Sequence, residues 1–167
     1  MRRLLAIVGA LVALAVLAAG CGGNTSSSTS SSGRAPASSS ATGTGGATVA
    51  VKGSKLGGIL VDGSGRTLYL FEKDQGTTSS CYGACAGGWP PYTTNGAPRA
   101  GAGAAASLLG TTTRTDGKTE VTYHGHPLYS FAGDRKPGDT NGEGLKAFGA
   151  EWYVLSAAGN KVEKEGS

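Results

Sequence analysis

The chain repeats a segment of itself at a separation of 60 residues, and this repeat constrains the fold more than any other feature. Residues 61–74 align without a gap with residues 121–134, and 6 of the 14 positions are identical. The identities include a tyrosine, a phenylalanine and an aspartate, so they do not simply reflect the abundant Gly and Ala of the chain. Each copy is followed by a tryptophan, Trp89 or Trp152. Such self-similarity predicts a duplicated supersecondary unit.

Both copies have the sequence pattern of a β-hairpin. In the first copy, residues 58–61 and 66–71 are strand-forming runs on either side of an Asp-Gly-Ser-Gly turn. In the second copy, residues 111–114 and 118–123 flank an Asp-Gly turn. Strand formers around such turns are typical of hairpins. Along residues 118–123, three side chains fall on each face of the strand. One face carries Thr119, Val121 and Tyr123, and the other carries Lys118, Glu120 and Thr122.

Three further segments complete the predicted fold. Residues 127–131 return after a His-Gly turn, and residues 151–155 form a final strand. The one helix candidate, residues 102–109, is short and flanked by glycine. We therefore expect an all-β fold, a small antiparallel meander built from two pseudo-repeated hairpin units with long loops.

The first 20 residues have the features of an export signal. Two arginines precede an apolar and small-residue run at positions 4–20, which is at the lower length limit for spanning ~30 Å of hydrocarbon. Small residues then lead to Cys21, as a signal peptidase requires. The segment resembles the lipobox of bacterial lipoproteins, although Ala18 stands where Leu is commoner. The resemblance implies that Cys21 carries fatty acyl chains (palmitate among them) after cleavage before it. An ordinary signal peptide and an uncleaved anchor are the alternatives.

A Ser/Thr/Gly-rich segment follows the cysteine, and up to residue 48 its only apolar side chain larger than that of Ala is Pro36. Such a segment cannot bury enough surface to offset its ordering entropy, so we predict a disordered tether. An O-glycosylated stalk is the alternative. All eleven aromatic residues lie between Tyr69 and Tyr153, which places the folded domain after the tether. The predicted organisation is a signal peptide at 1–20, a lipidated cysteine and tether at 21–48, a β domain at 49–160 with repeats at about 56–92 and 111–156, and a charged tail at 161–167.

The repeated pattern Tyr-x-Phe-x-x-Asp resembles the motif of the bacterial secreted-repeat lipoproteins named for Yx(F/W/Y)xxD. The motif residues are Tyr69, Phe71 and Asp74 in the first copy and Tyr129, Phe131 and Asp134 in the second. The segments around Gly65–Tyr69, Cys81–Ala86, Trp89–Pro91 and Gly138–Gly142 match as well. The resemblance covers roughly residues 55–156 and implies an extracytoplasmic repeat domain. It supplies no chemistry, because the family is largely uncharacterised, and Glu143 stands where we expect Gln.

The motif also has a physical interpretation of its own. Tyr and Phe two positions apart on a strand share one face, and the Asp falls in the following loop. There it can accept backbone hydrogen bonds in an Asx-turn. The favoured interpretation is a pair of core aromatics and a loop-capping carboxylate in each repeat. The alternative is an aromatic-walled site with a carboxylate.

Two cysteines remain once Cys21 is lipidated, and they enclose only three residues. Outside the cytoplasm, Cys81 and Cys85 are expected to form a disulfide. The alternative is a redox-active pair, which lacks Cys-x-x-Cys spacing and a predicted helix N-terminus to lower a thiol pKa. Haem attachment is excluded because Ala86, not His, follows the second cysteine.

Weaker candidate sites are better explained as turns. His124 and His126, together with the two cysteines, have the ligand types of a zinc or copper site. Asp139 and Asn141 lie in an acidic, Gly-rich loop similar to part of a calcium loop, but the full pattern is absent. Two loose dinucleotide fingerprints follow no buried parallel strand, and no Gly-x-Ser-x-Gly elbow occurs. We therefore expect no metal, no cofactor and no catalytic residue.

The charge balance argues against nucleic-acid binding. After loss of the signal, 13 Lys and Arg oppose 11 Asp and Glu, and no basic block remains. The expected protein is a lipid-anchored lipoprotein on the extracytoplasmic side of the cell membrane. It acts as a non-enzymatic binding or structural module of the envelope, contacting the membrane through its lipid and an unknown envelope protein or small ligand. The alternative is a redox or metal-handling lipoprotein that uses Cys81, Cys85, His124 and His126.

Overall fold

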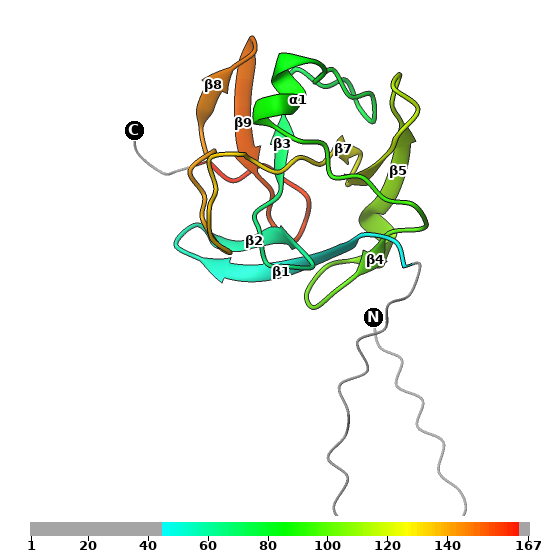
Figure 1. Ribbon diagram of the computed structural model, residues 1–167. Coiled ribbons are helices and arrows are strands. Elements are labelled where there is room, and N and C mark those ends of the chain that lie inside the picture. Colours follow the sequence, from blue (N-terminus) through cyan, green and yellow to red (C-terminus); the bar gives the residue numbers. More distant parts are fainter. Residues whose placement is uncertain (1–44, 164–167) are drawn as a thin grey trace, which may run out of the picture. The chain divides into compact units, whose positions relative to one another are not determined.

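The computed structural model describes residues 45–163, and strands dominate this part of the chain (Figure 1). The elements are β1 (Thr48–Ser54), β2 (Gly57–Asp62), β3 (Tyr69–Phe71), α1 (Ala84–Gly88), β4 (Arg99–Ala100), the 3-10 helix η1 (Ala106–Leu108), β5 (Leu109–Thr113), β6 (Thr119–Tyr123), β7 (His126–Pro127), β8 (Leu145–Ala147) and β9 (Ala150–Val154). No helix within residues 45–163 has the length and apolar character needed to cross a membrane.

The described strands form three small sheets, with the orders β2-β1-β4, β3-β9-β8 and β5-β6-β7. Every neighbouring pair is antiparallel except β1 and β4, which are parallel. The all-β class with small antiparallel sheets is thereby confirmed. One sheet joins the two repeats, because β3 of the first repeat pairs with β9 at the end of the second, with Phe71 opposite Trp152.

Turn chemistry fixes the hairpins as the sequence predicts. After β2, the Asp62 carboxylate accepts the backbone N–H groups of Ser64 and Arg66 at 2.8 and 2.9 Å. Burial raises the pKa of Asp62, but the hydrogen bond from the Ser64 hydroxyl, together with those from Arg66 and the backbone, outweighs it and holds the pKa below the ordinary value. Between β6 and β7, His124 and Gly125 both have positive φ, 51° and 83°, the conformation of the two-residue turns that match strand twist.

The helix prediction for residues 102–109 is wrong in extent, since only a 3-10 turn, η1, forms there. The Ala102 carbonyl accepts the N–H of Val51 in β1 at 2.8 Å, and Gly103 has φ 76°, so tertiary pairing overrides the local Ala propensity. The α-helical turn lies instead at α1, whose second residue is Cys85, so one domain cysteine stands at a helix N-terminus that is not predicted from the sequence. The backbone of α1 is closed by the Trp89 N–H donating to the Cys85 carbonyl at 2.7 Å.

Backbone hydrogen bonds tie both ends of the described chain to the sheets. The Ala47 N–H donates to the Thr94 hydroxyl at 2.9 Å, and its carbonyl accepts the N–H of Arg99 at 2.8 Å. The Val162 N–H donates to the Val154 carbonyl at 2.9 Å. These terminal residues belong to the fold through backbone hydrogen bonds, which amino-acid composition cannot predict. The predicted signal peptide at 1–20, Cys21 and most of the tether lie outside the described residues.

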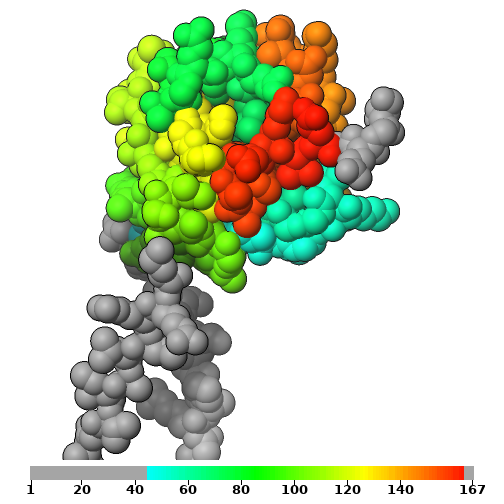
Figure 2. Space-filling model, turned by 180° about the vertical axis from the view of Figure 1, so that it is seen from behind, coloured from blue at the N-terminus to red at the C-terminus, as the bar shows by residue number. Residues whose placement is uncertain are grey.

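The core has two apolar clusters, and both combine the two repeats. β3 lies between them, with Tyr69 and Phe71 facing one cluster and Leu70 facing the other. The chain after β9 closes the fold against the first hairpin, since the Leu60 N–H donates to the Leu155 carbonyl at 2.9 Å and Ile59 bridges Ser156. Figure 2 shows this last segment in red, directly above the first strands in cyan.

Candidate functional site

The two copies of the sequence motif meet at their tyrosines. The Tyr69 N–H donates to the Tyr129 carbonyl at 2.8 Å, and the Tyr129 N–H donates back to the Tyr69 carbonyl at 3.0 Å. This reciprocal antiparallel bridge is the contact expected at a local two-fold axis. The duplicated units are therefore paired face to face, with equivalent residues opposite each other.

Across this axis the repeats exchange side-chain hydrogen bonds. The Tyr69 hydroxyl donates to Asp134 Oδ2 at 2.6 Å, and the Tyr129 hydroxyl donates to Asp74 Oδ2 at 2.7 Å. Each motif tyrosine thus binds the motif aspartate of the other copy. Burial is the main cause that raises the pKa of both hydroxyls far above the ordinary value, so both stay protonated donors.

The second oxygen of each aspartate holds the loop of its own repeat. Asp74 Oδ1 accepts the N–H and the hydroxyl of Ser80, both at 2.7 Å, and Asp134 Oδ1 accepts the N–H of Asn141 at 2.9 Å. These donors lie six and seven residues further on, so the loops are wider than the expected Asx-turns. Burial raises the pKa of both carboxyls, although the hydrogen bonds they accept lower it.

Four aromatic rings from alternating repeats form one continuous stack. Phe71 stacks on Trp152 with a centroid separation of 4.0 Å, and Trp152 stacks on Trp89 at 3.9 Å. Trp89 in turn stacks on Phe131 at 4.3 Å. Offset stacking of this kind adds about 0.5–1.5 kcal/mol per pair beyond area burial. Only Phe131 is more than marginally exposed, so the motif aromatics mainly fill the core.

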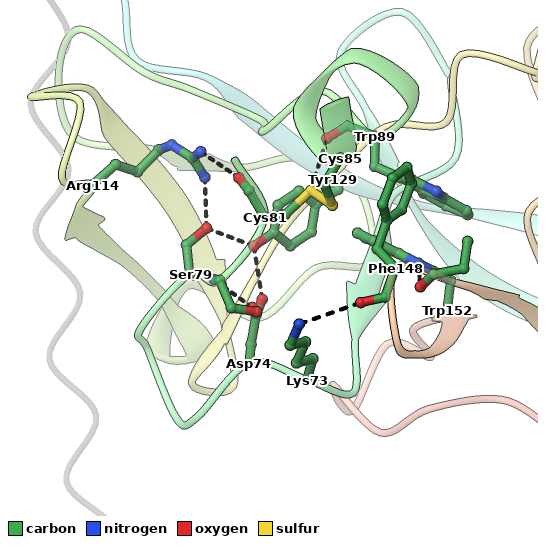
Figure 3. The surroundings of a disulfide bond; sticks show 12 residues. Lys73, Asp74, Ser79, Cys81, Cys85, Trp89, Arg114, Tyr129, Phe148 and Trp152 are labelled. Atoms are coloured by element: carbon green, nitrogen blue, oxygen red, sulfur yellow. Dashed lines mark hydrogen bonds between the residues drawn. A yellow bond between two sulfur atoms is a disulfide. The ribbon is translucent and has the colours of Figure 1, made fainter. Parts of the chain in front are cut away.

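Cys81 and Cys85 form a disulfide bond with a Cα–Cα distance of 5.2 Å, and both are buried (Figure 3). Their sulfur atoms are bonded to each other and are not available as the zinc or copper ligands considered with the histidines. His124 is exposed and His126 half-buried, with ring centroids 6.4 Å apart on the β6–β7 turn. Within residues 45–163, no three or more His, Cys, Asp and Glu residues are placed to hold a metal ion.

In the loop that resembles part of a calcium site, side-chain oxygens accept hydrogen bonds from backbone N–H groups. Asp139 Oδ2 accepts the N–H groups of Arg135 and Lys136, both at 3.0 Å. Asn141 bonds Asp134, as described above, and Glu143 Oε2 accepts the N–H of Val154 at 2.7 Å. These contacts make the segment a hydrogen-bonded turn that ties the second repeat to β9.

A buried ion pair that sequence reasoning missed links the second hairpin to the disulfide loop. Arg114 and Glu120 are fully buried, and Arg114 Nη1 donates to Glu120 Oε2 at 2.7 Å. The same guanidinium donates to the Ser79 hydroxyl and to the Cys81 carbonyl, both at 2.6 Å (Figure 3). Ser79 in turn shares a hydrogen bond of 2.7 Å with the Tyr129 hydroxyl. The network therefore runs from Glu120 to the motif.

Burial makes Glu120 sensitive to pH in the neutral range. Desolvation raises its pKa to about 7 from 4.5, although Arg114 acts in the opposite direction. An acid whose pKa is higher in the folded state adds stability in full below pH 4.5 and loses it as the pH rises through 7.

Replacing Glu120 by glutamine leaves the buried Arg114 without its counter-charge and is expected to lower stability, but less at pH 8 than at pH 5, because the natural chain itself loses stability as Glu120 ionises. The difference in unfolding free energy between E120Q and the natural chain is measured by urea denaturation at both pH values. Glu151→Gln alters a more exposed glutamate and is the matched control, with little change expected. Equal differences at the two pH values for E120Q would contradict this assignment.

Two open clefts are present, and Phe71 of the aromatic stack lines the second of them. One, of about 690 Å³, is lined by polar and small residues of 93–98, 110–111 and 117–119. The other, of about 560 Å³, includes Glu72, Asp74 and His126. In this second cleft Glu72 is paired with Lys161 at 2.7 Å, and Asp74 holds Tyr129 and Ser80. Its carboxylates are thus engaged within the fold.

Comparison with known families places the duplication in context. The model of a family described as a secreted repeat of unknown function matches the chain twice, at residues 50–93 and 110–156. Together the two matches cover more than half of the chain and coincide with the two units that meet at the tyrosine bridge. The chain belongs to this secreted-repeat family. No curated protein and no solved structure matches it. The suspected family is confirmed, and a secreted-repeat protein is extracytoplasmic, where a disulfide such as Cys81–Cys85 persists.

Proposed function

We propose that this secreted-repeat protein is anchored to the membrane by fatty acyl chains on Cys21 and works on the extracytoplasmic side. The support is the order of features at the N-terminus: two arginines, a short apolar run, small residues and then a cysteine. A Ser/Thr/Gly-rich tether follows and gives the domain room to stand off from the bilayer. Two or three acyl chains hold a protein firmly, whereas one binds only weakly.

In this proposal the domain is a non-enzymatic binding or structural module of the cell envelope. The observation that carries it is the exchange of hydrogen bonds between Tyr69 and Asp134 and between Tyr129 and Asp74. The tyrosine hydroxyls and aspartate carboxylates of the motif, which could have formed a binding site, hydrogen-bond to each other. They are used to join the two repeats, so the module presents its surface and loops to a ligand or partner.

The anchor is tested by replacing Cys21 with alanine in the full chain. C21A is expected to leave the membrane fraction and the detergent phase, because no thiol remains to be acylated. Mass spectrometry of the natural protein is expected to show an acylated residue 21 as the first residue. Gly22→Ala, which leaves the cysteine in place, is the matched control and should stay with the membrane. The anchor assignment fails if residue 21 of the natural protein is not acylated, or if C21A that has lost residues 1–20 still partitions with membranes.

A further inference from the structure

One hairpin carries all the exposed large apolar side chains of residues 45–163. Leu145 in β8 is 40% exposed, and Phe148 in the turn between β8 and β9 is 46% exposed. Scattered single apolar residues are normal on a protein surface, but two on one hairpin, with no others among residues 45–163, form a localised patch. We call residues 145–150 the Phe148 hairpin.

The turn of the Phe148 hairpin is strained by its own sequence. Ala147 and Ala150 are the last paired residues, so Phe148 and Gly149 form a two-residue turn, with φ 57° and 100°. The first of these positions favours Asn, Asp or Gly, and a bulky residue there is strained. The phenyl ring is 46% exposed, so its burial offsets this strain only in part. Phenylalanine is thus poorly suited to the turn itself, which points to a role at the surface.

The ring nevertheless has a defined place. The Phe148 carbonyl accepts a hydrogen bond from Lys73 Nζ at 3.3 Å. One edge of the ring lies 3.9 Å from where a Cβ at Gly88 would stand, beside the disulfide loop (Figure 3). A supported aromatic side chain loses little conformational entropy on binding, which suits it as an anchor.

Two lysines flank the apolar tip. Lys73 contacts the turn, and Lys146, next to Leu145 in β8, has a largely exposed side chain that pairs with Glu151 at 3.2 Å. Apolar side chains at a tip with ammonium groups beside them complement a bilayer surface, where acyl chains lie beneath anionic headgroups. Figures 1 and 2 both show this hairpin at the end of the domain away from β1, so the tip projects from the fold.

We propose that the Phe148 hairpin docks the domain onto an anionic phospholipid bilayer by inserting the Phe148 and Leu145 side chains among the lipid headgroups. This inference rests on the lipid anchor of the proposed function. A stable protein complex buries about 1,200 Å² or more, far beyond what two side chains offer. A domain already attached to the bilayer needs much less, because attachment gives a high effective concentration. The 24 residues from Cys21 to Thr44 can span at most about 80 Å, enough for the tip to turn toward the bilayer.

The test separates docking from anchoring by removing the anchor. The mature chain with Cys21→Ser is mixed with vesicles of phosphatidylglycerol and phosphatidylethanolamine, and its bound fraction is measured by co-sedimentation. Phe148→Asn is expected to lower the partition coefficient about fivefold, because it removes a half-exposed phenyl ring. It should leave thermal stability unchanged or raised, since Asn suits the turn. His124→Asn makes the same change at the other non-glycine turn position with positive φ and should bind like the parent chain.

Two results overturn the docking inference. One is equal vesicle binding by the F148N, H124N and parent chains. The other is that the parent chain does not bind the vesicles at all. If sedimentation velocity then shows a dimer that F148N abolishes, the Phe148 hairpin contacts a second copy of the protein instead of a bilayer. Neither result affects the lipid anchor, which depends only on the acylation of residue 21 and on where C21A partitions in cells.

Discussion

Replacing Trp152 by alanine is expected to lower the free energy of unfolding by about 4 kcal/mol. Its indole lies between Phe71 and Trp89 in the four-ring stack, and the Tyr129 ring meets it edge-on at a centroid distance of 5.2 Å. Truncation leaves a cavity between rigid rings from both repeats, which cannot collapse without separating them. Urea denaturation followed by far-UV circular dichroism measures the loss.

The local two-fold axis supplies the matched variant. Trp89 occupies the equivalent position, stacked between Trp152 and Phe131 with the Tyr69 ring edge-on at 5.3 Å. W89A is therefore expected to cost about as much as W152A, whereas the milder W152F keeps a ring in place and should cost clearly less. A loss below 1 kcal/mol for either alanine variant would show that the stack does not hold the repeats together.

Replacing Arg114 by methionine is expected to cost about 3–5 kcal/mol at pH 8, because it leaves Glu120 buried without its counter-charge. The change also removes the donors to Ser79 and to the Cys81 carbonyl, so the disulfide loop loses its contact with β5 and β6. At pH 5 the loss should be smaller, since a protonated Glu120 needs no partner charge. Chemical denaturation at both pH values measures the difference.

The double variant R114M/E120L distinguishes a buried charge from lost packing. It removes both charges, so most of the stability lost in R114M should return. Arg66→Met, which removes a largely exposed partner of Asp62, is the control and should cost less than about 1 kcal/mol. If R114M and the double variant are equally unstable, the cost comes from the lost contacts to the disulfide loop.

The β5–β6 and β6–β7 hairpins and the turn after β2 could be predicted from the sequence because their signals are local, whereas the β1–β2 and β8–β9 hairpins are not predicted. Asp62 and the glycine after Asp116 specify turns within a few residues, and the period of two in residues 118–123 marks a strand. The pairing of the two repeats follows the alignment of residues 61–74 with 121–134. All of these features depend on residues close in the chain or on self-similarity.

The contacts between the repeats could not be predicted in the same way. Within one copy, the motif is fully accounted for by two core aromatics and a capping carboxylate. The sequence of one copy therefore does not predict that Tyr69 binds Asp134 of the other copy. The alternating pattern of β6 assigns its side chains to two faces of the strand, but it does not tell which face is buried. Glu120 and Thr122 are buried as fully as Val121, because the disulfide loop and the motif cover the second face. Arg114 carries no sequence signal for this role.

The exchange of tyrosine and aspartate partners has a consequence for the origin of the protein. Neither copy can complete its interior alone, since each needs the carboxylate and the indole of the other. A gene with a single copy would encode a chain that reaches this architecture only as a pair of identical molecules. Fusion of two such genes would make that pairing independent of protein concentration. After fusion, a substitution in one repeat would have to remain compatible with the contacts made by the other repeat.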